Sequence, residues 1–134
     1  VLDLLRDLSR ESGTSVLLIT HDLGVVAEMC SRVIVMYAGE IVEEATVEDL
    51  FARPQHPYTV GLLGSIPRAQ ARRARLSSIA GMVPSLAEPI AGCRFAARCP
   101  FADEHCRTKA PPLAETSAGH RSRCWKTPLE ALVA

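Results

Sequence analysis

The chain has 134 residues, 48% of them hydrophobic and only 4% aromatic, and its formal charges cancel. This length suits one domain or one and a half small ones, with an aliphatic core. No apolar run approaches the roughly 20 residues of a membrane helix, so any membrane span must come from partners. Residues 1–66 carry four Arg against ten Asp and Glu, and residues 67–134 carry eleven basic residues against five acidic ones. This asymmetry predicts two modules with different surroundings.

The first expected element is an amphipathic helix over residues 1–10, because its apolar residues share one face, and Gly13 suits a helix stop. The chain opens at Val1 in the middle of this pattern, which indicates a piece of a longer protein. Residues 15–20 then form a short apolar run that is typical of a strand buried in a parallel sheet.

His21 and Asp22 follow that predicted strand directly. In open α/β sheets, ligands bind beyond the carboxyl ends of the strands, so His21 lies where chemistry is expected. Its imidazole can donate a hydrogen bond and can titrate near neutral pH. The alternative is a histidine that merely caps the next helix or fills the strand end. Asp22 suits the N-cap of the next helix, in which Cys30 falls on the buried stripe as a core residue.

A hairpin is predicted next, from strands over residues 33–37 and 40–44 around the turn at Ala38 and Gly39. Thr46 and Asp49 have the spacing of a capping box and predict a short helix that stops at Pro54. Pro57 suits the first turn of a further helix, over residues 58–66. From Pro67 the chain becomes a basic connector with Arg68, Arg72, Arg73 and Arg75, and after residue 76 it is loop-rich with little regular structure.

Four cysteines lie in the loop-rich part, at Cys93, Cys99, Cys106 and Cys124. Such a segment buries little apolar surface and usually needs a cross-link, such as disulfides or a bound metal, to be stable. Disulfides, a structural zinc ion and a [4Fe–4S] cluster are the three alternatives. His105 or His120 could replace one cysteine at zinc. Seven Arg and Lys residues interleaved with the cysteines would offset thiolate charge and hydrogen bond to sulfur, which favours a metal centre over disulfides without choosing the metal.

Several stretches resemble the ATP-binding subunits of dipeptide and oligopeptide ABC transporters. LLITHDLGVVAEMCSRVIVMYAGEIVEE resembles the end of an ABC nucleotide-binding domain, and HPYTVGLLGSIP resembles the helix that follows it in those subunits. GCRFAARCPFADEHC, PPL and HRSRCW resemble their C-terminal extension. The THD tripeptide alone is shared by all ABC ATPases, whereas HPYT together with the four cysteines is specific.

The resemblance implies an α/β fold: the C-terminal part of a P-loop ABC-ATPase domain, followed by a small loop-rich extension that binds a metal or cluster. The expected domains are residues 1–45 for the nucleotide-binding part, 46–66 for a helical annex and 67–134 for the four-cysteine extension. His21 matches the switch-loop histidine that contacts the γ-phosphate of ATP, and Asp22 matches the acidic residue that supports the loop. The four cysteines match positions that hold a [4Fe–4S] cluster in some members, with Zn²⁺ as the alternative.

The implied partners are a second ATPase subunit, transmembrane permease subunits and, indirectly, a solute-binding protein, at the cytoplasmic face of the bacterial plasma membrane. No nucleic-acid partner is expected. The chain contains no glycine-rich phosphate loop, ABC signature or Walker B carboxylates, so ATP and Mg²⁺ would need residues outside it. We expect the isolated chain to hydrolyse no ATP. The alternatives are an ABC ATPase for nickel or another small solute, and a free-standing zinc or iron–sulfur interaction module.

Overall fold

The computed structural model describes residues 1–66 and 78–132, and the basic connector lies outside them. The described chain divides into two compact units, Val1–Ser31 and Arg32–Ala134. Both helices and strands occur, as expected for a mixed α/β protein, but the sheet is antiparallel. None of the described helices is long and apolar enough to cross a membrane.

The first unit contains two helices, α1 (Leu2–Ser12) and α2 (Leu23–Met29). Both helices were predicted. Local chemistry explains where α1 ends and where α2 begins. Gly13 ends α1 with a φ of 65°, in the left-handed region that glycine adopts at no steric cost. The Asp22 carboxylate caps α2 by accepting from the amides of Gly24 (2.9 Å) and Val25 (3.2 Å). Cys30 is the half-buried C-cap of α2.

The buried strand predicted over residues 15–20 is wrong for this structure. The segment has no regular secondary structure, and Leu17 and Ile19 are 88% and 92% exposed. A strand needs a neighbour to pair its backbone groups, and no strand pairs with this segment among the described residues. The apolar side chains of residues 15–20 favour burial, but the described part of the chain supplies no surface that covers them.

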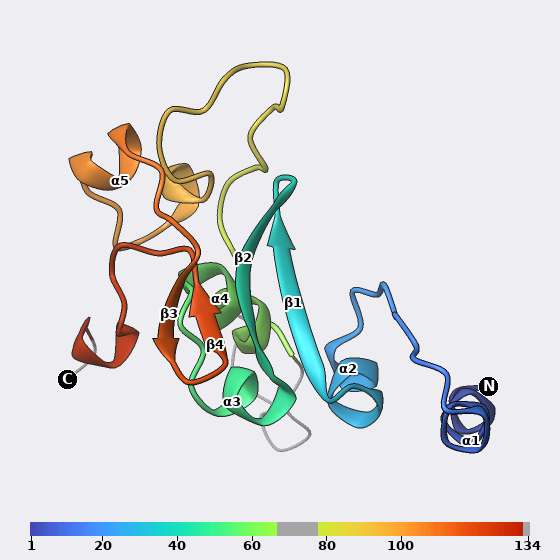
Figure 1. Cartoon of the computed structure of the whole chain (residues 1–134). Coiled ribbons are helices and arrows are strands. Elements are labelled where there is room, and N and C mark those ends of the chain that lie inside the picture. The colour runs from blue at the N-terminus through green and yellow to red at the C-terminus, as the bar shows by residue number, and fades with distance from the viewer. Residues whose placement is uncertain (67–77, 133–134) are drawn as a thin grey trace, which may run out of the picture. The chain divides into compact units, whose positions relative to one another are not determined.

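The second unit is built on a four-stranded sheet in the order β1-β2-β4-β3 (Figure 1). Strands β1 (Arg32–Tyr37) and β2 (Glu40–Thr46) form the predicted hairpin. Ala38 and Gly39, both with positive φ, make its two-residue turn. Strands β3 (Ala114–Ser117) and β4 (His120–Ser122) were not predicted, and β4 pairs with β2. The last part of the chain thus completes the sheet that the hairpin begins.

Helices α3 (Val47–Ala52) and α4 (Pro57–Gly64) follow the hairpin. The capping box is confirmed, because the amide of Asp49 donates to Oγ1 of Thr46 at 3.2 Å. The core of the unit is aliphatic and aromatic, and its buried members are Val35, Tyr37, Val42, Ala45, Leu50 and Phe95. Phe95 comes from the cysteine-containing segment and packs edge-on to Tyr37 at 5.2 Å between ring centroids.

The cysteine-containing segment has more regular structure than the sequence indicated. It contains the 3-10 helix η1 (Ala96–Arg98), helix α5 (Glu104–Thr108) and, near the C-terminus, the 3-10 helix η2 (Leu129–Leu132). These turns are short and lack the apolar periodicity that marks longer helices, which explains why sequence reasoning missed them. The units found here divide at residue 31, and the boundaries expected at residues 45 and 66 stay a prediction.

Candidate functional site

His21 lies in a turn held by its two neighbours. The amide of Asp22 donates to Oγ1 of Thr20 at 3.0 Å, and the Asp22 carboxylate caps α2. The side chain of His21 is exposed, and no hydrogen bond or ion pair to it occurs within residues 1–66 and 78–132. The turn therefore fixes the backbone of His21 and leaves the imidazole available to a ligand.

All four predicted cysteines line one pocket, although their positions span 32 residues of sequence. Cys93 precedes η1, Cys99 ends it, Cys106 lies in α5, and Cys124 follows β4. The pocket is lined by His56, Pro57, Cys93, Phe95, Ala96, Cys99, Ala102, Cys106, Cys124, Trp125 and Lys126. All four are free thiols, with Cys106 buried and the others half-buried.

Backbone contacts hold the cysteine loops together. The amide of Cys93 donates to the carbonyl of Cys106 at 2.8 Å. Gly92 makes this approach possible, because a Cβ atom there would lie 2.3 Å from the same carbonyl oxygen. Asp103 caps α5 by accepting from the amide of Cys106 at 2.9 Å, and it forms an ion pair with Lys126. This pair ties α5 to the loop that carries Cys124.

Two opposing effects act on the thiols. Burial raises the pKa of Cys93 and Cys99, and raises the pKa of Cys124 to about 11. Backbone amides that bond to the sulfurs lower these pKa values, as the amide of Lys126 does for Cys124 at 3.3 Å. The amides of Phe95 and Phe101 do the same for Cys93 and Cys99. Such amides stabilise a thiolate once a cation or cluster displaces the proton.

The arrangement is not that of a preformed single-ion site. Among the residues that the structure describes, no three His, Cys, Asp or Glu side chains are grouped so that they could hold a metal ion. The free space in the pocket is about 10 Å³, room for about one water molecule. The thiol-bearing loops would therefore have to separate to admit a larger group.

Two expectations about the surroundings of the cysteines are wrong. Neither His105 nor His120 lines the pocket. His105 packs edge-on to Trp125 with 4.6 Å between ring centroids, and His120 bonds to Glu43. Of the seven interleaved basic residues, only Lys126 lines it. Two of the Arg side chains bind backbone carbonyls elsewhere. Arg98 donates to those of Ile79 and Ala80, and Arg123 donates to that of Ile41 in the hairpin.

His56 is the pocket residue that sequence reasoning missed. It begins α4, where its Nδ1 accepts from the amide of Tyr58 at 3.1 Å. It is 1% exposed, and burial lowers its pKa to about 4, so the ring is neutral at pH 7. The signal was present in the HPYT stretch, but the proline that follows the histidine suggested only a helix start.

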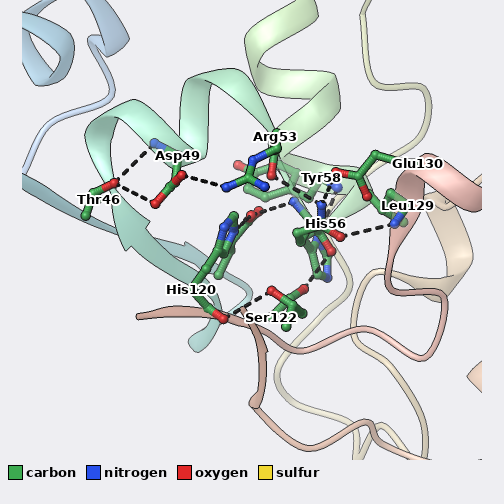
Figure 2. Close-up of polar contacts among 12 residues, drawn as sticks. Thr46, Asp49, Arg53, His56, Tyr58, His120, Ser122, Leu129 and Glu130 are labelled. Carbon is green, nitrogen blue, oxygen red and sulfur yellow. Dashed lines mark hydrogen bonds and ion pairs between the residues drawn. The ribbon is translucent and has the colours of Figure 1, made fainter. Parts of the chain in front are cut away.

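A second polar cluster attaches the C-terminal residues to the hairpin (Figure 2). Oε1 of Glu43 lies 2.7 Å from Nε2 of His120 and accepts from the amide of Gln55 at 2.6 Å. The Gln55 side chain accepts from the amide of Leu129 and donates to the carboxylate of Glu130. The backbone carbonyl of Gln55 accepts from the Ser122 hydroxyl at 2.7 Å. This cluster holds the chain in place before Cys124, at His120 and Ser122, and after it, at Leu129 and Glu130.

Comparisons with known proteins bear on the origin of this site. Residues 42–106 match the family described as "Oligopeptide/dipeptide transporter, C-terminal region". The matched residues include most of the hairpin strand β2, His56 and three of the four cysteines, so the resemblance noted from the sequence is confirmed.

Relatives extend the match beyond the C-terminal region. The chain is 59% identical over 128 residues to the "Probable peptide ABC transporter ATP-binding protein y4tR" of Sinorhizobium fredii, covering 95% of the chain and 38% of the relative. It is 52% identical over 125 residues to the "Oligopeptide transport ATP-binding protein AppD" of Bacillus subtilis, covering 93% of the chain and again 38% of the relative. It is 49% identical over 130 residues to OppD of Mycobacterium tuberculosis, covering 96% of the chain and 21% of that protein. The chain therefore spans well under half the length of these relatives.

Proposed function

We propose that this chain is the C-terminal part of an ATP-hydrolysing subunit that powers import of di- and oligopeptides by an ABC transporter. The observation that carries the proposal is the 59% identity to a protein named as a peptide ABC transporter ATP-binding protein, over 95% of the chain. In this assignment the subunit lies at the cytoplasmic face of the membrane, pairs with a second ATPase subunit and acts on permease partners.

His21 has the hydrolytic role in this proposal. Its exposed imidazole donates a hydrogen bond to the terminal phosphate of an ATP molecule that residues outside this chain bind with Mg²⁺. Asp22 anchors the turn to α2, because its carboxylate accepts hydrogen bonds from the first amides of that helix. The amide of Asp22 also donates to Oγ1 of Thr20 at 3.0 Å, which holds the backbone on both sides of His21.

The test uses the complete subunit assembled with its permease. Substitution of a preorganised donor to a developing charge costs about 10²–10³ in rate, so His21→Ala is expected to reduce phosphate release by that factor. His105→Ala is the matched control, since His105 is an exposed histidine that packs on Trp125. Equal turnover in the His21→Ala and unchanged subunits would overturn the role of His21.

Transport assays separate peptide import from the alternative solute classes. Vesicles that contain the assembled transporter should accumulate a labelled dipeptide when ATP is present on the side of the ATPase subunits. ATP-dependent accumulation of Ni²⁺ without peptide accumulation would contradict the peptide assignment and favour a small-solute importer.

The four thiols have a structural role in this proposal, as ligands of a [4Fe–4S] cluster. The number and kind of donors support a cluster, since a cubane takes one thiolate at each iron and does not require four sulfurs to converge on one atom. The amides directed at three of the sulfurs are the hydrogen bonds that such a cluster receives. Peptide import includes no redox step, so the cluster would hold the loops together.

The metal content of anaerobically purified protein tests this part. Brown protein that contains iron and acid-labile sulfide supports the cluster. Colourless protein with one zinc ion per chain would contradict it and favour the zinc alternative. Protein with neither metal, and with all four thiols reactive after unfolding, would leave the residues as ordinary cysteines.

A further inference from the structure

Cys93 and Cys106 lie much closer together than their separation in the sequence suggests. The amide of Cys93 donates to the carbonyl of Cys106 at 2.8 Å. With standard covalent geometry, this hydrogen bond keeps the two Cα atoms within about 6.7 Å of each other. Disulfide bonds join cysteines whose Cα atoms are about 4.4–6.8 Å apart. The two backbones therefore lie within the range in which a disulfide can form.

The side chains of the same two cysteines face one small space. Both line the thiol pocket, whose free volume is about 10 Å³. That volume holds about one water molecule, so no layer of solvent separates the side chains around it. The thiols of Cys93 and Cys106 are thus directed toward a common centre as well as carried by adjacent backbones.

Local contacts hold this pair of cysteines in place. A Cβ atom at Gly92 would lie 2.3 Å from the Cys106 carbonyl oxygen, so the two loops meet at a position that only glycine allows. Asp103 accepts from the amide of Cys106 at 2.9 Å, which fixes the turn that carries this thiol. In the described part of the chain, no other two of the four cysteines share a backbone hydrogen bond. The geometry singles out one pair.

The two thiols differ in how easily a small reagent reaches them. Cys93 is half-buried, whereas Cys106 is only 6% exposed. A small oxidant in solution therefore meets Cys93 first and leaves Cys106 as the neighbouring thiol. A cysteine that is oxidised first, next to a second cysteine that then bonds to it, is the usual arrangement of a redox-sensitive pair.

We propose that peroxide oxidation of the metal-free chain joins Cys93 to Cys106 by a disulfide bond. Hydrogen peroxide oxidises the Cys93 thiol to a sulfenic acid and is itself reduced to water. The Cys106 sulfur then attacks the Cys93 sulfur and the S–O bond breaks. The hydroxyl group leaves with the Cys106 proton as a second water molecule. A dithiol reductant reverses the bond by thiol–disulfide exchange.

The disulfide also controls whether the thiol site can be loaded. Once Cys93 and Cys106 are joined, only Cys99 and Cys124 remain as free thiols for a metal or cluster. This consequence rests on the proposed cluster, whereas the pairing itself concerns the metal-free chain and stands without it. In a compartment that keeps thiols reduced, the bond is transient.

Peptide mapping of the oxidised chain tests the pairing. The reduced, metal-free full chain is treated with hydrogen peroxide, the remaining thiols are blocked with iodoacetamide, and digestion with trypsin and Glu-C separates the four cysteines. Burial raises the pKa of the Cys93 thiol, so the reaction is run at pH 9 as well as at pH 7. Mass spectrometry should find Cys93 linked to Cys106, with Cys99 and Cys124 alkylated. A different pair, or alkylation of both Cys93 and Cys106, would overturn the proposal.

Two variants and an unfolded control show whether the folded geometry directs the reaction. Cys106→Ser should lose the cross-link and leave Cys93 as a sulfenic acid that dimedone traps. Cys124→Ser is the matched control and should keep the cross-link, because Cys124 takes no part in it. In concentrated urea the unchanged chain should give a mixture of pairings. The same single pair, formed equally fast in urea, would show that the fold plays no part.

Anaerobic reconstitution with ferrous iron and sulfide separates failure of this inference from failure of the cluster assignment. The reduced chain should take up iron, and the cross-linked chain should take up none until a dithiol reductant is added. Equal uptake by the two forms would contradict the control of loading. If neither form takes up iron, the cluster assignment fails, and the peptide map alone decides whether Cys93 pairs with Cys106.

Discussion

Nε2 of His120 lies 2.7 Å from Oε1 of Glu43, across 77 residues of sequence and in the buried centre of the second unit. The same carboxylate oxygen accepts from the amide of Gln55 at 2.6 Å. One side chain of the hairpin therefore binds both β4 and the loop before α4. Because both partners are buried, removal of the carboxylate leaves polar groups that water cannot reach.

Glu43→Ala should lower the free energy of unfolding by about 3 kcal/mol or more, since it leaves the His120 ring and the Gln55 amide without their acceptor. Urea denaturation at pH 7 measures this. The matched control is Glu44→Ala, because Glu44 lies on the other side of β2 in partly exposed ion pairs with Arg32 and Arg121. The control should cost less than about 1 kcal/mol. Equal effects of the two substitutions would contradict the assignment of Glu43 as the buried connection.

Gly92→Ala should disrupt the contact between the loops of Cys93 and Cys106. The new methyl group would lie 2.3 Å from the Cys106 carbonyl oxygen, so the backbones must separate and the 2.8 Å hydrogen bond must lengthen. We expect a destabilisation of about 1–3 kcal/mol. Backbone amide exchange at Cys93 should also become faster. Exchange at Cys93 that matches the unchanged chain would show that the two loops do not meet as described.

Acidification should destabilise the second unit through His56. Burial lowers the pKa of this ring to about 4, whereas the unfolded ring titrates near 6.5. Between these values the unfolded state binds the extra proton, so stability falls as the pH falls. The expected loss between pH 7 and pH 5 is about 2 kcal/mol.

The carboxylates are expected to contribute little in that range. Their partners lower the pKa of Asp103 and Glu130, so the stability that these groups contribute is lost nearer pH 4 and below. His56→Asn should remove most of the loss between pH 7 and pH 5. Unfolding curves that show the same pH dependence with and without His56 would contradict the burial of a neutral ring.

The metal-free thiol of Cys124 should be slow to alkylate at neutral pH. Burial raises its pKa to about 11, so at pH 8 it should react about 100 times more slowly than a thiol of pKa 9, before any effect of access. Its labelling rate should rise up to about pH 11. A rate that reaches its plateau below pH 9 would show that the thiol is exposed or activated.

The parts of the fold that sequence predicted well depend on chemistry within a few residues. The Asp22 cap, the Thr46–Asp49 box and the Ala38–Gly39 turn each follow from side chains or φ values separated by three positions or fewer. The buried strand over residues 15–20 failed because an apolar run shows that burial is needed and not which neighbour supplies it. Strand β4 has three polar residues and gains its place only by pairing with β2.

The candidate site also combines features that the sequence predicts with features that depend on contacts between distant residues. The four cysteines could be selected from the sequence by their number and setting, but their convergence on one pocket depends on Gly92, Asp103 and Lys126. The partners of the Arg side chains could not be predicted, because carbonyls such as that of Ile41 become available only once the hairpin has formed. His56 was overlooked for a similar reason, since it lines the pocket from the start of α4, far from the four cysteines in the sequence.

The most direct test of the cluster is a serine scan of all five cysteines, with iron and sulfide counted per chain after anaerobic reconstitution. Cys30→Ser is the internal control, because Cys30 caps α2 in the first unit and is not among the pocket residues. We predict that serine at Cys93, Cys99, Cys106 or Cys124 abolishes or sharply reduces bound iron, and that Cys30→Ser retains it. Iron that is unaffected by two or more of the four substitutions, or lost in Cys30→Ser, would contradict the account.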